Sequence, residues 1–267
     1  MSIELPPVRV EGIGFWASRL PGWNIARAVI RGEQPAPDIA SVRPAPTMLA
    51  PTERRRAPDA VAVALEVASK ACESAGRAPS DLPSVFASTH GDLAISDYMC
   101  ATLAATPTLI SPVKFHNSVH NAAAGYWSIG AGSYAPYTAL SAFQYTFGVG
   151  LLEAVTQVAC ENRPVLYVAF DIEAKGPLGT IAPSRGLLGA ALVLAPAAAG
   201  HGGRNLALRV EDDNSPVSTP ARSTAATLVG DNALAPCLPL FEALAADDAS
   251  TTAFQLSDRM SLHVRTS

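Results

Sequence analysis

The 267-residue chain has few charged residues, few aromatic residues and few cysteines, and each shortage excludes a class of protein. Charged residues make up 16% of the chain and aromatic residues 6%, whereas hydrophobic residues make up 49%. A chain this apolar builds a large core, so disorder over most of its length is excluded. With so few charges, part of the surface is expected to be covered by a partner rather than by water.

Basic residues are not in excess, and long apolar runs are missing. The net charge is −4, which gives no support to nucleic-acid binding, because that function favours basic surfaces. No basic segment with a long apolar run opens the chain, so no signal peptide is expected. No run approaches the ~20 apolar residues of a membrane span, since 187–200 is short and contains Pro196. We therefore expect a cytoplasmic protein without a membrane span.

The cysteines are too few and too scattered for a structural framework. They are Cys72, Cys100, Cys160 and Cys237, with no CxxC pair. This spacing predicts neither a zinc knuckle nor a set of disulfides. We expect free, buried thiols in a reducing compartment, with Cys160 in the core at the end of a helix.

Helical patterns alternate with short buried strands, which predicts an α/β fold. Strands are expected at 8–16, 84–89, 137–142, 163–171, 189–196 and 206–212, and helices at 58–76, 118–130 and 145–160. Residues 33–57, rich in Pro and Arg, and 111–117 and 213–233 are expected to be irregular. One domain is predicted over 1–267, with a core at about 55–212 and a terminal helix and hairpin in 234–267.

One stretch, ALSAFQYTFGVGLLEA at 139–154, has the pattern of a nucleophile elbow. A strand delivers a side chain to a sharp turn, and a helix begins just behind it. The candidates at the turn are Ser141, Phe143, Gln144, Tyr145 and Thr146. The pattern alone leaves open which of them occupies the tip.

The elbow belongs to a block of about forty residues, NSVHNAAAGYWSIGAGSYAPYTALSAFQYTFGVGLLEA. It holds Asn121, Ala123-Ala124-Gly125, Pro136 and Glu153-Ala154, with Ala135 where glycine is usual. This block resembles the central stretch of the β-ketoacyl synthases, and the likeness in element order extends over roughly 55–212. The resemblance implies a thiolase-like α/β fold. Without a gap, it places Gln144 where the family has its nucleophilic cysteine.

The resemblance is closest to truncated chain length factors of aryl polyene and type II fatty-acid-like synthases. It implies a single N-terminal-type half, βαβαβαββ, without the second half that carries the family's catalytic histidines. After Gln144 only His201 and His263 remain, and His201 follows the elbow too soon to match the family motif. We therefore expect Gln144 to be a vestigial nucleophile position. We expect no catalytic residue, no cofactor and no metal.

The resemblance also implies partners and the residues that would meet them. The partners are a full-length β-ketoacyl synthase, forming a heterodimer, and an acyl carrier protein. Side chains expected to line an acyl tunnel are Phe143, Gln144, Tyr145 and Phe147. The expected dimer interface comprises Tyr137, Thr138, Ala139, Leu140, Ser141, Ala142 and Asn121. Arg54, Arg55 and Arg56 are candidates for docking the acidic carrier, or else a solvated surface segment.

Other interpretations stay open at this stage. Gln144 could be only a hydrogen-bonded plug, because its amide cannot ionise. Ser141 could replace the nucleophile, although a buried hydroxyl is the simpler expectation. His116 and His120 form an HxxxH pair that could bind zinc, but no third ligand is evident, and His90 follows a strand. The chain could thus also be a condensing or acyl-transfer enzyme with an unconventional site, or a scaffold that binds acyl carriers.

Overall fold

The computed structural model describes residues 2–197, 204–212 and 218–267. Its strands are β1 Ser2–Glu4, β2 Val8–Ala17, β3 Ser84–Ala87, β4 Tyr137–Leu140, β5 Val165–Asp171, β6 Leu188–Pro196, β7 Arg204–Asp212, β8 Ser250–Gln255 and β9 Met260–Thr266. Its helices are α1 Trp23–Ile30, α2 Pro51–Arg56, α3 Asp59–Ala75, α4 Leu93–Ala105, α5 Pro112–Asn117, α6 Ala122–Ala131, α7 Thr146–Glu161, α8 Leu178–Ile181, α9 Thr224–Val229 and α10 Leu238–Ala245.

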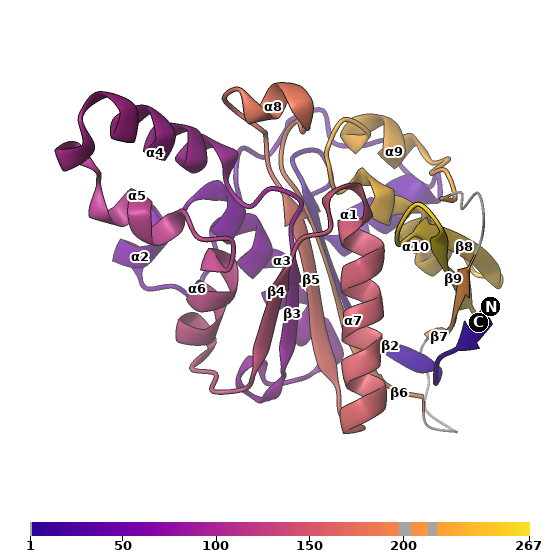
Figure 1. Ribbon diagram of the computed structural model, residues 1–267. Helices are drawn as coiled ribbons and strands as arrows, with labels where there is room; N and C mark the ends of the chain where they lie inside the picture. Colours follow the sequence, from indigo (N-terminus) through magenta and orange to yellow (C-terminus); the bar gives the residue numbers. More distant parts are fainter. Residues whose placement is uncertain (1, 198–203, 213–217) are drawn as a thin grey trace.

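The strands form one mixed sheet in the order β4-β3-β5-β6-β2-β7-β9-β8, and β1 pairs with β7 (Figure 1). Strand β3 lies between β4 and β5 and is parallel to both. Strand β6 is antiparallel to both of its neighbours, β5 and β2. The predicted α/β class is confirmed, and the βαβαβαββ succession runs from β2 to β6. This order leaves β4, the strand before the elbow, at the edge of the sheet.

Helices cover both faces of the sheet, α3 on one face and α7 on the other. Glycines let α3 approach β2 unusually closely. A Cβ added at Gly12 would lie 2.1 Å from the Ala71 carbonyl oxygen, and one at Gly14 would lie 1.9 Å from that of Val67. Any side chain at either position would therefore push the helix away from the sheet and open the core that lies between them.

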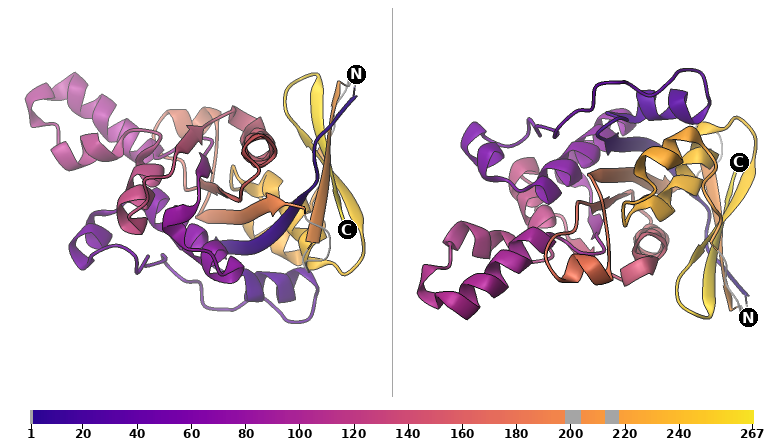
Figure 2. Two further views of the ribbon diagram at one scale, coloured as in Figure 1. Left: turned by 90° about the horizontal axis from the view of Figure 1, so that it is seen from below. Right: turned by 90° about the horizontal axis from the view of Figure 1, so that it is seen from above.

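The C-terminal strands form a second wing of the sheet. Figure 2 shows β7, β9 and β8 turned steeply away from the central strands, with α10 in the angle between them. The wing packs closely against the start of α7. A Cβ added at Gly148 of α7 would lie only 3.0 Å from the Cβ of Phe254 in β8. The terminal helix and hairpin that the sequence predicts are present, and the hairpin holds the first turn of the elbow helix.

Several local expectations are wrong. Residues 111–117 are not a loop, because Ser111 caps the N-terminus of α5 and Pro112 occupies its first turn. The irregular segment 33–57 contains α2, and 213–233 contains α9. Among the described residues, no helix has the length and apolar character required to cross a membrane.

Candidate functional site

The elbow is a short 3₁₀ turn, Phe143–Tyr145, between β4 and α7. Thr146 closes the turn from the helix side. Its hydroxyl donates to the Phe143 carbonyl over 2.6 Å and accepts the Ala142 backbone N–H over 3.0 Å. The Tyr145 N–H donates to the Ala142 carbonyl over 3.0 Å. These bonds fix the turn without any ligand.

Phe143 adopts a left-handed backbone conformation at the tip of the turn, with φ at 51°. Its side chain is 55% exposed, and Gln144 beside it is also exposed. An apolar ring held in a strained conformation and facing outward is poorly explained by the fold of this chain alone. The residues that follow β4 thus present an apolar tip and a neutral amide, and no group that ionises near neutral pH to act as a nucleophile.

The strain at Phe143 predicts an unusual order of stabilities. We expect Phe143→Gly to be more stable than Phe143→Ala by about 1 kcal/mol, because glycine adopts a left-handed conformation without a Cβ clash. Both variants lose the phenyl ring, so each serves as the control for the other. Thermal unfolding should show a difference of roughly 2–4 °C. If alanine proves as stable as glycine, the turn is not strained.

Tyr145 ties the elbow to the C-terminal hairpin. Its hydroxyl donates to Oδ1 of Asp258 over 2.5 Å, and Asp258 lies in the turn between β8 and β9. The hydrogen bond to this carboxylate raises the pKa of Tyr145. Phe147, the second residue of α7, instead packs in the core against Tyr167 and Phe254. Of the four candidate tunnel residues, Phe143, Gln144 and Tyr145 lie at the elbow surface, whereas Phe147 lies beneath it.

Ser141 is exposed, so the prediction of a buried hydroxyl is wrong. Strand β4 ends at Leu140, and none of the strands in the described part of the chain covers its outer edge. The Ser141 hydroxyl donates to the Thr89 carbonyl over 3.0 Å. This bond joins the elbow to the loop after β3, and no histidine or carboxylate among the described residues contacts the hydroxyl as a base would.

A buried carboxylate, Asp171, organises the loop beside the elbow. It lies at the end of β5, is fully buried and accepts from the Ser88 hydroxyl over 2.8 Å and the Thr89 N–H over 2.9 Å. The His90 N–H donates to it over 3.3 Å. Burial raises the pKa of Asp171, and the bonds from Ser88 and Thr89 oppose that rise. The sequence offered one signal for this residue, an Asp directly after a buried strand.

Removing this carboxylate should unfold the loop that supports Ser141. We expect Asp171→Ala to lower stability by about 3 kcal/mol, because three donors lose a buried acceptor. The thermal midpoint should fall by roughly 6–12 °C. Asp258→Ala, which removes an exposed carboxylate, is the control and should cost under about 1 kcal/mol. A similar loss in both variants would contradict a central role for Asp171.

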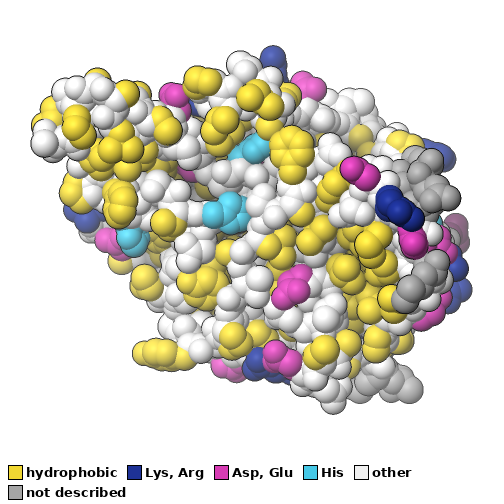
Figure 3. Space-filling view, in the orientation of Figure 1, with side chains coloured by type: hydrophobic (Ala, Val, Ile, Leu, Met, Phe, Trp, Pro, Cys, Tyr) yellow, Lys and Arg dark blue, Asp and Glu magenta, His cyan; other side chains and the backbone are white. Residues whose placement is uncertain are grey.

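Several histidine side chains come to the surface on the face shown in Figure 3, but those in the described part of the chain do not gather into a metal site. His120 Nε2 donates to the Ser88 carbonyl over 2.8 Å. The His116 ring packs edge-on against Tyr126, with centroids 5.9 Å apart. His90 Nε2 is buried and has no hydrogen-bond partner in the described part of the chain. No cluster of three metal-ligating side chains occurs among those residues, and His201 lies outside them.

Two exposed apolar features lie on the β4 side of the molecule. The first is β4 itself, where Tyr137 is 41% exposed and the rest of the strand is half-buried. Asn121 Nδ2 donates to the Tyr137 hydroxyl over 3.3 Å, so these two candidate interface residues are adjacent. The second feature is an arm formed by residues 93–117, which projects from the body (Figure 1). We call it the α4–α5 arm.

The α4–α5 arm is apolar but largely unburied. Of the thirteen residues of α4, only Leu93 and Ile95 are buried. Leu103, Leu109 and Phe115 are 53%, 69% and 61% exposed, and apolar side chains gather on the arm in Figure 3. An apolar projection of this kind is typical of a protein–protein contact.

The three arginines and the cysteines are also placed by the structure. Arg54, Arg55 and Arg56 occupy α2, where Arg54 is half-buried and the other two are exposed. Cys72 and Cys237 are buried, but Cys100 and Cys160 are exposed. The prediction that all four thiols are buried is therefore wrong for two, because α4 and the end of α7 are covered on one side only.

Comparison with known proteins agrees with this architecture. The family model described as the N-terminal domain of β-ketoacyl synthases matches residues 30–257, and the chain belongs to this family. No match was found among the curated proteins. The elbow between β4 and α7 is thus that of a ketosynthase-like protein with a mixed α/β sheet.

Solved structures share the fold over nearly the whole chain. One is a ketosynthase (ApeO) in complex with its chain length factor (ApeC) from Xenorhabdus doucetiae. It has a TM-score of 0.70 and 19% identity, covering 96% of this chain and 98% of that one. The ishigamide ketosynthase/chain length factor has a TM-score of 0.69 and 14% identity, and the match covers 98% of this chain and 99% of that one. AntDE:AntF, a type II polyketide acyl carrier protein in complex with its ketosynthase, has a TM-score of 0.71 and 11% identity. The match covers 98% of this chain and 99% of that one.

Proposed function

We propose that this chain is a non-catalytic ketosynthase-like subunit, a chain length factor, which pairs with an active β-ketoacyl synthase. The observation that carries the proposal is the elbow. It keeps the strand, turn and helix of a ketosynthase but presents Phe143 and Gln144 in place of a cysteine. A neutral amide at the start of α7 can exchange hydrogen bonds but cannot form a thioester.

The exposed edge and arm support a heterodimer. Strand β4 has a free edge beside the elbow, and the α4–α5 arm is apolar and uncovered on the same side of the molecule. In this proposal the partner's strand pairs with β4, and the arm packs on the partner. The solved structures that share the fold include complexes of ketosynthases with chain length factors.

The proposed role of the elbow is to shape the partner's acyl tunnel in a cytoplasmic aryl polyene or fatty-acid-like pathway. Phe143 would limit the space for the growing chain, with Gln144 and Tyr145 beside it. Arg54, Arg55 and Arg56 would attract the acidic acyl carrier protein, since guanidinium groups pair well with carboxylates and phosphate. The whole chain would act as one ketosynthase-like domain.

Co-expression with a full-length ketosynthase from the same genome tests the pairing. The two chains should co-purify at equal stoichiometry, and the pair should elongate acyl chains that neither subunit elongates alone. If the chain purifies by itself and still captures acyl carrier protein, it is a carrier-binding scaffold instead. An acyl adduct trapped on this chain by mass spectrometry would make it an enzyme in its own right.

A further inference from the structure

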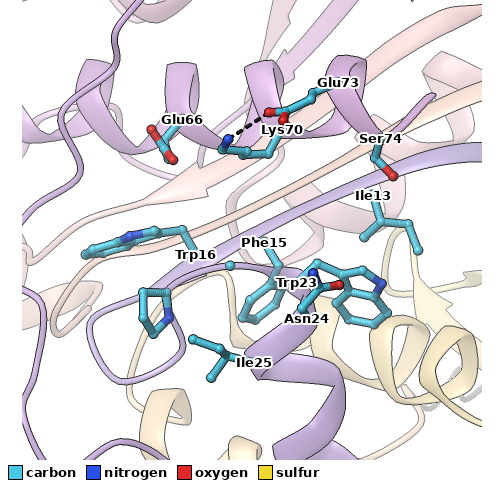
Figure 4. Close-up of a pocket in the computed structure, with 12 residues that line it drawn as sticks. Ile13, Phe15, Trp16, Trp23, Asn24, Ile25, Glu66, Lys70, Glu73 and Ser74 are labelled. Carbon is cyan, nitrogen blue, oxygen red and sulfur yellow. Dashed lines mark hydrogen bonds and ion pairs between the residues drawn. The ribbon is translucent and has the colours of Figure 1, made fainter. Parts of the chain in front are cut away.

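A cleft lies along the part of β2 that, within residues 2–197, 204–212 and 218–267, pairs with β6 alone. Strand β6 pairs with β2 over Val8–Ala17, whereas β7 pairs with it only over Val8–Val10. After β2 the chain turns back at Leu20, which bonds to Ala17, and then departs into α1. A cavity of about 780 Å³ remains between α3 and α1 (Figure 4). This volume is in the range of small-molecule sites.

The two walls of the cleft differ in chemistry. Its floor and the wall toward α1 are largely apolar, formed by Ile13, Phe15, Trp16, Pro21, Gly22, Trp23, Asn24 and Ile25. The opposite wall is polar and is formed by one side of α3, with Glu66, Lys70, Glu73 and Ser74. Two of the chain's three tryptophans line the cleft. A cleft that is lined by tryptophan rings on one wall and by carboxylates on the other favours an organic cation over other ligands.

The charges on the α3 wall leave one carboxylate available. Lys70 Nζ bonds to Glu73 Oε2 over 2.7 Å, and its charge also attracts Glu66, four residues earlier on α3. Glu66 is half-buried, and no donor in the described part of the chain hydrogen-bonds to it. Burial raises the pKa of Glu66, because the carboxylate has lost part of its hydration. With Glu66, Lys70 and Glu73 all ionised, the lining carries a net charge of −1, because two carboxylates share one ammonium group.

Figure 4 shows how these groups lie. Glu66 and Trp16 are at one end of the cleft, Trp23 and Asn24 are at the other, and Phe15 lies between the two tryptophans. An ammonium group placed at the first end would meet a carboxylate and an indole together. An apolar body attached to it would extend over Phe15 toward Trp23. An anion at the same place would face a lining that has one carboxylate in excess.

We propose that this cleft binds a monocationic organic amine, with its ammonium group between Glu66 and Trp16 and its apolar body on the floor of the cleft. This site is separate from the residues that carry the proposed function. None of the lining residues belongs to the elbow, to β4 or to the α4–α5 arm. The polar wall comes from α3, on the face of the sheet opposite α7. Failure of one proposal would therefore leave the other standing.

Three probes with the same body and different charges test the proposal. They are 4-phenylbutylamine, 4-phenylbutan-1-ol and 4-phenylbutanoate, measured by calorimetry and by tryptophan emission. Trp16, although only 5% exposed, and Trp23 line the cleft, whereas Trp127 does not, so changes in emission report on Trp16 and Trp23. We expect the amine to bind about tenfold more tightly than the alcohol, and the carboxylate to bind more weakly than both.

Glu66→Gln tests whether the carboxylate provides the preference. In this variant the amine and the alcohol should bind equally, within about twofold. Glu161→Gln removes the same charge from α7, outside the cleft, and should keep the tenfold preference. Equal binding of the three probes to the unmodified chain would overturn the proposal. So would an absence of binding at millimolar concentration, or an unchanged preference in Glu66→Gln.

Discussion

If this chain pairs with a ketosynthase as proposed, a proline at position 139 is expected to separate the two chains and to leave the fold of this chain intact. Ser84 N–H donates to the Pro136 carbonyl and Ser88 N–H to the Leu140 carbonyl, over 3.1 and 3.2 Å. Backbone groups along a strand point alternately to its two sides, so Ala139 directs its N–H away from β3 and toward the free edge. Proline there removes a hydrogen bond to the partner only.

The expected loss of affinity is about 2 kcal/mol, or roughly 30-fold in Kd, because a partner carbonyl is left without its donor. Pull-down and titration of the purified subunits measure it, and the thermal midpoint of the isolated chain should stay within about 2 °C. Ala139→Ser keeps the N–H and is the matched control. Equal affinities of the proline and serine variants would mean that β4 does not pair with the partner.

Shortening the side chain at position 143 is expected to lengthen the products of the reconstituted pair. Phe143 is the large apolar group at the tip of the elbow. One methylene in an apolar pocket changes relative rates by about 10- to 200-fold, so the space of a phenyl ring should allow at least one further extension step. Phe143→Ala should shift the main product upward, and Phe143→Trp should shift it downward.

Mass spectrometry of the carrier-bound products measures this shift. Tyr134→Ala is the control, because Tyr134 is a fully exposed aromatic residue outside the elbow. Product lengths that stay constant in all three variants would place Phe143 outside the tunnel. In that case the heterodimer would still stand, since the pairing is tested separately at Ala139.

The sequence predicts the central fold well because its strands are buried on both faces. Continuous apolar runs such as those of β5 and β6 have few alternative structures, and α3 ends where Gly76 adopts a left-handed conformation, as its position predicts. By contrast, α1 was not predicted. It has eight residues and no side-chain cap, and its contacts with β2, α9 and α10 stabilise it.

The candidate site is harder to predict because it depends on contacts between distant segments. Asp171 holds the loop after β3, which lies more than eighty residues earlier in the chain. Tyr145 reaches Asp258, more than one hundred residues later. Nor does the local sequence show that β4 is an edge strand, and this position is what exposes Ser141. The block from Asn121 to Glu153 is enough to locate the elbow in the sequence. The residues that surround the elbow can be identified only from the folded structure.

The position of β2 also bears on how the chain folds as it is made. This strand is synthesised before the other central strands, yet its neighbours β6 and β7 begin about 170 and 190 residues after it ends. At 5–20 residues per second, β2 waits roughly 9 to 34 s before either edge can pair. During that time the α4–α5 arm and β4 are already complete. A partner present at the ribosome would thus meet the proposed interface before the sheet behind it has closed.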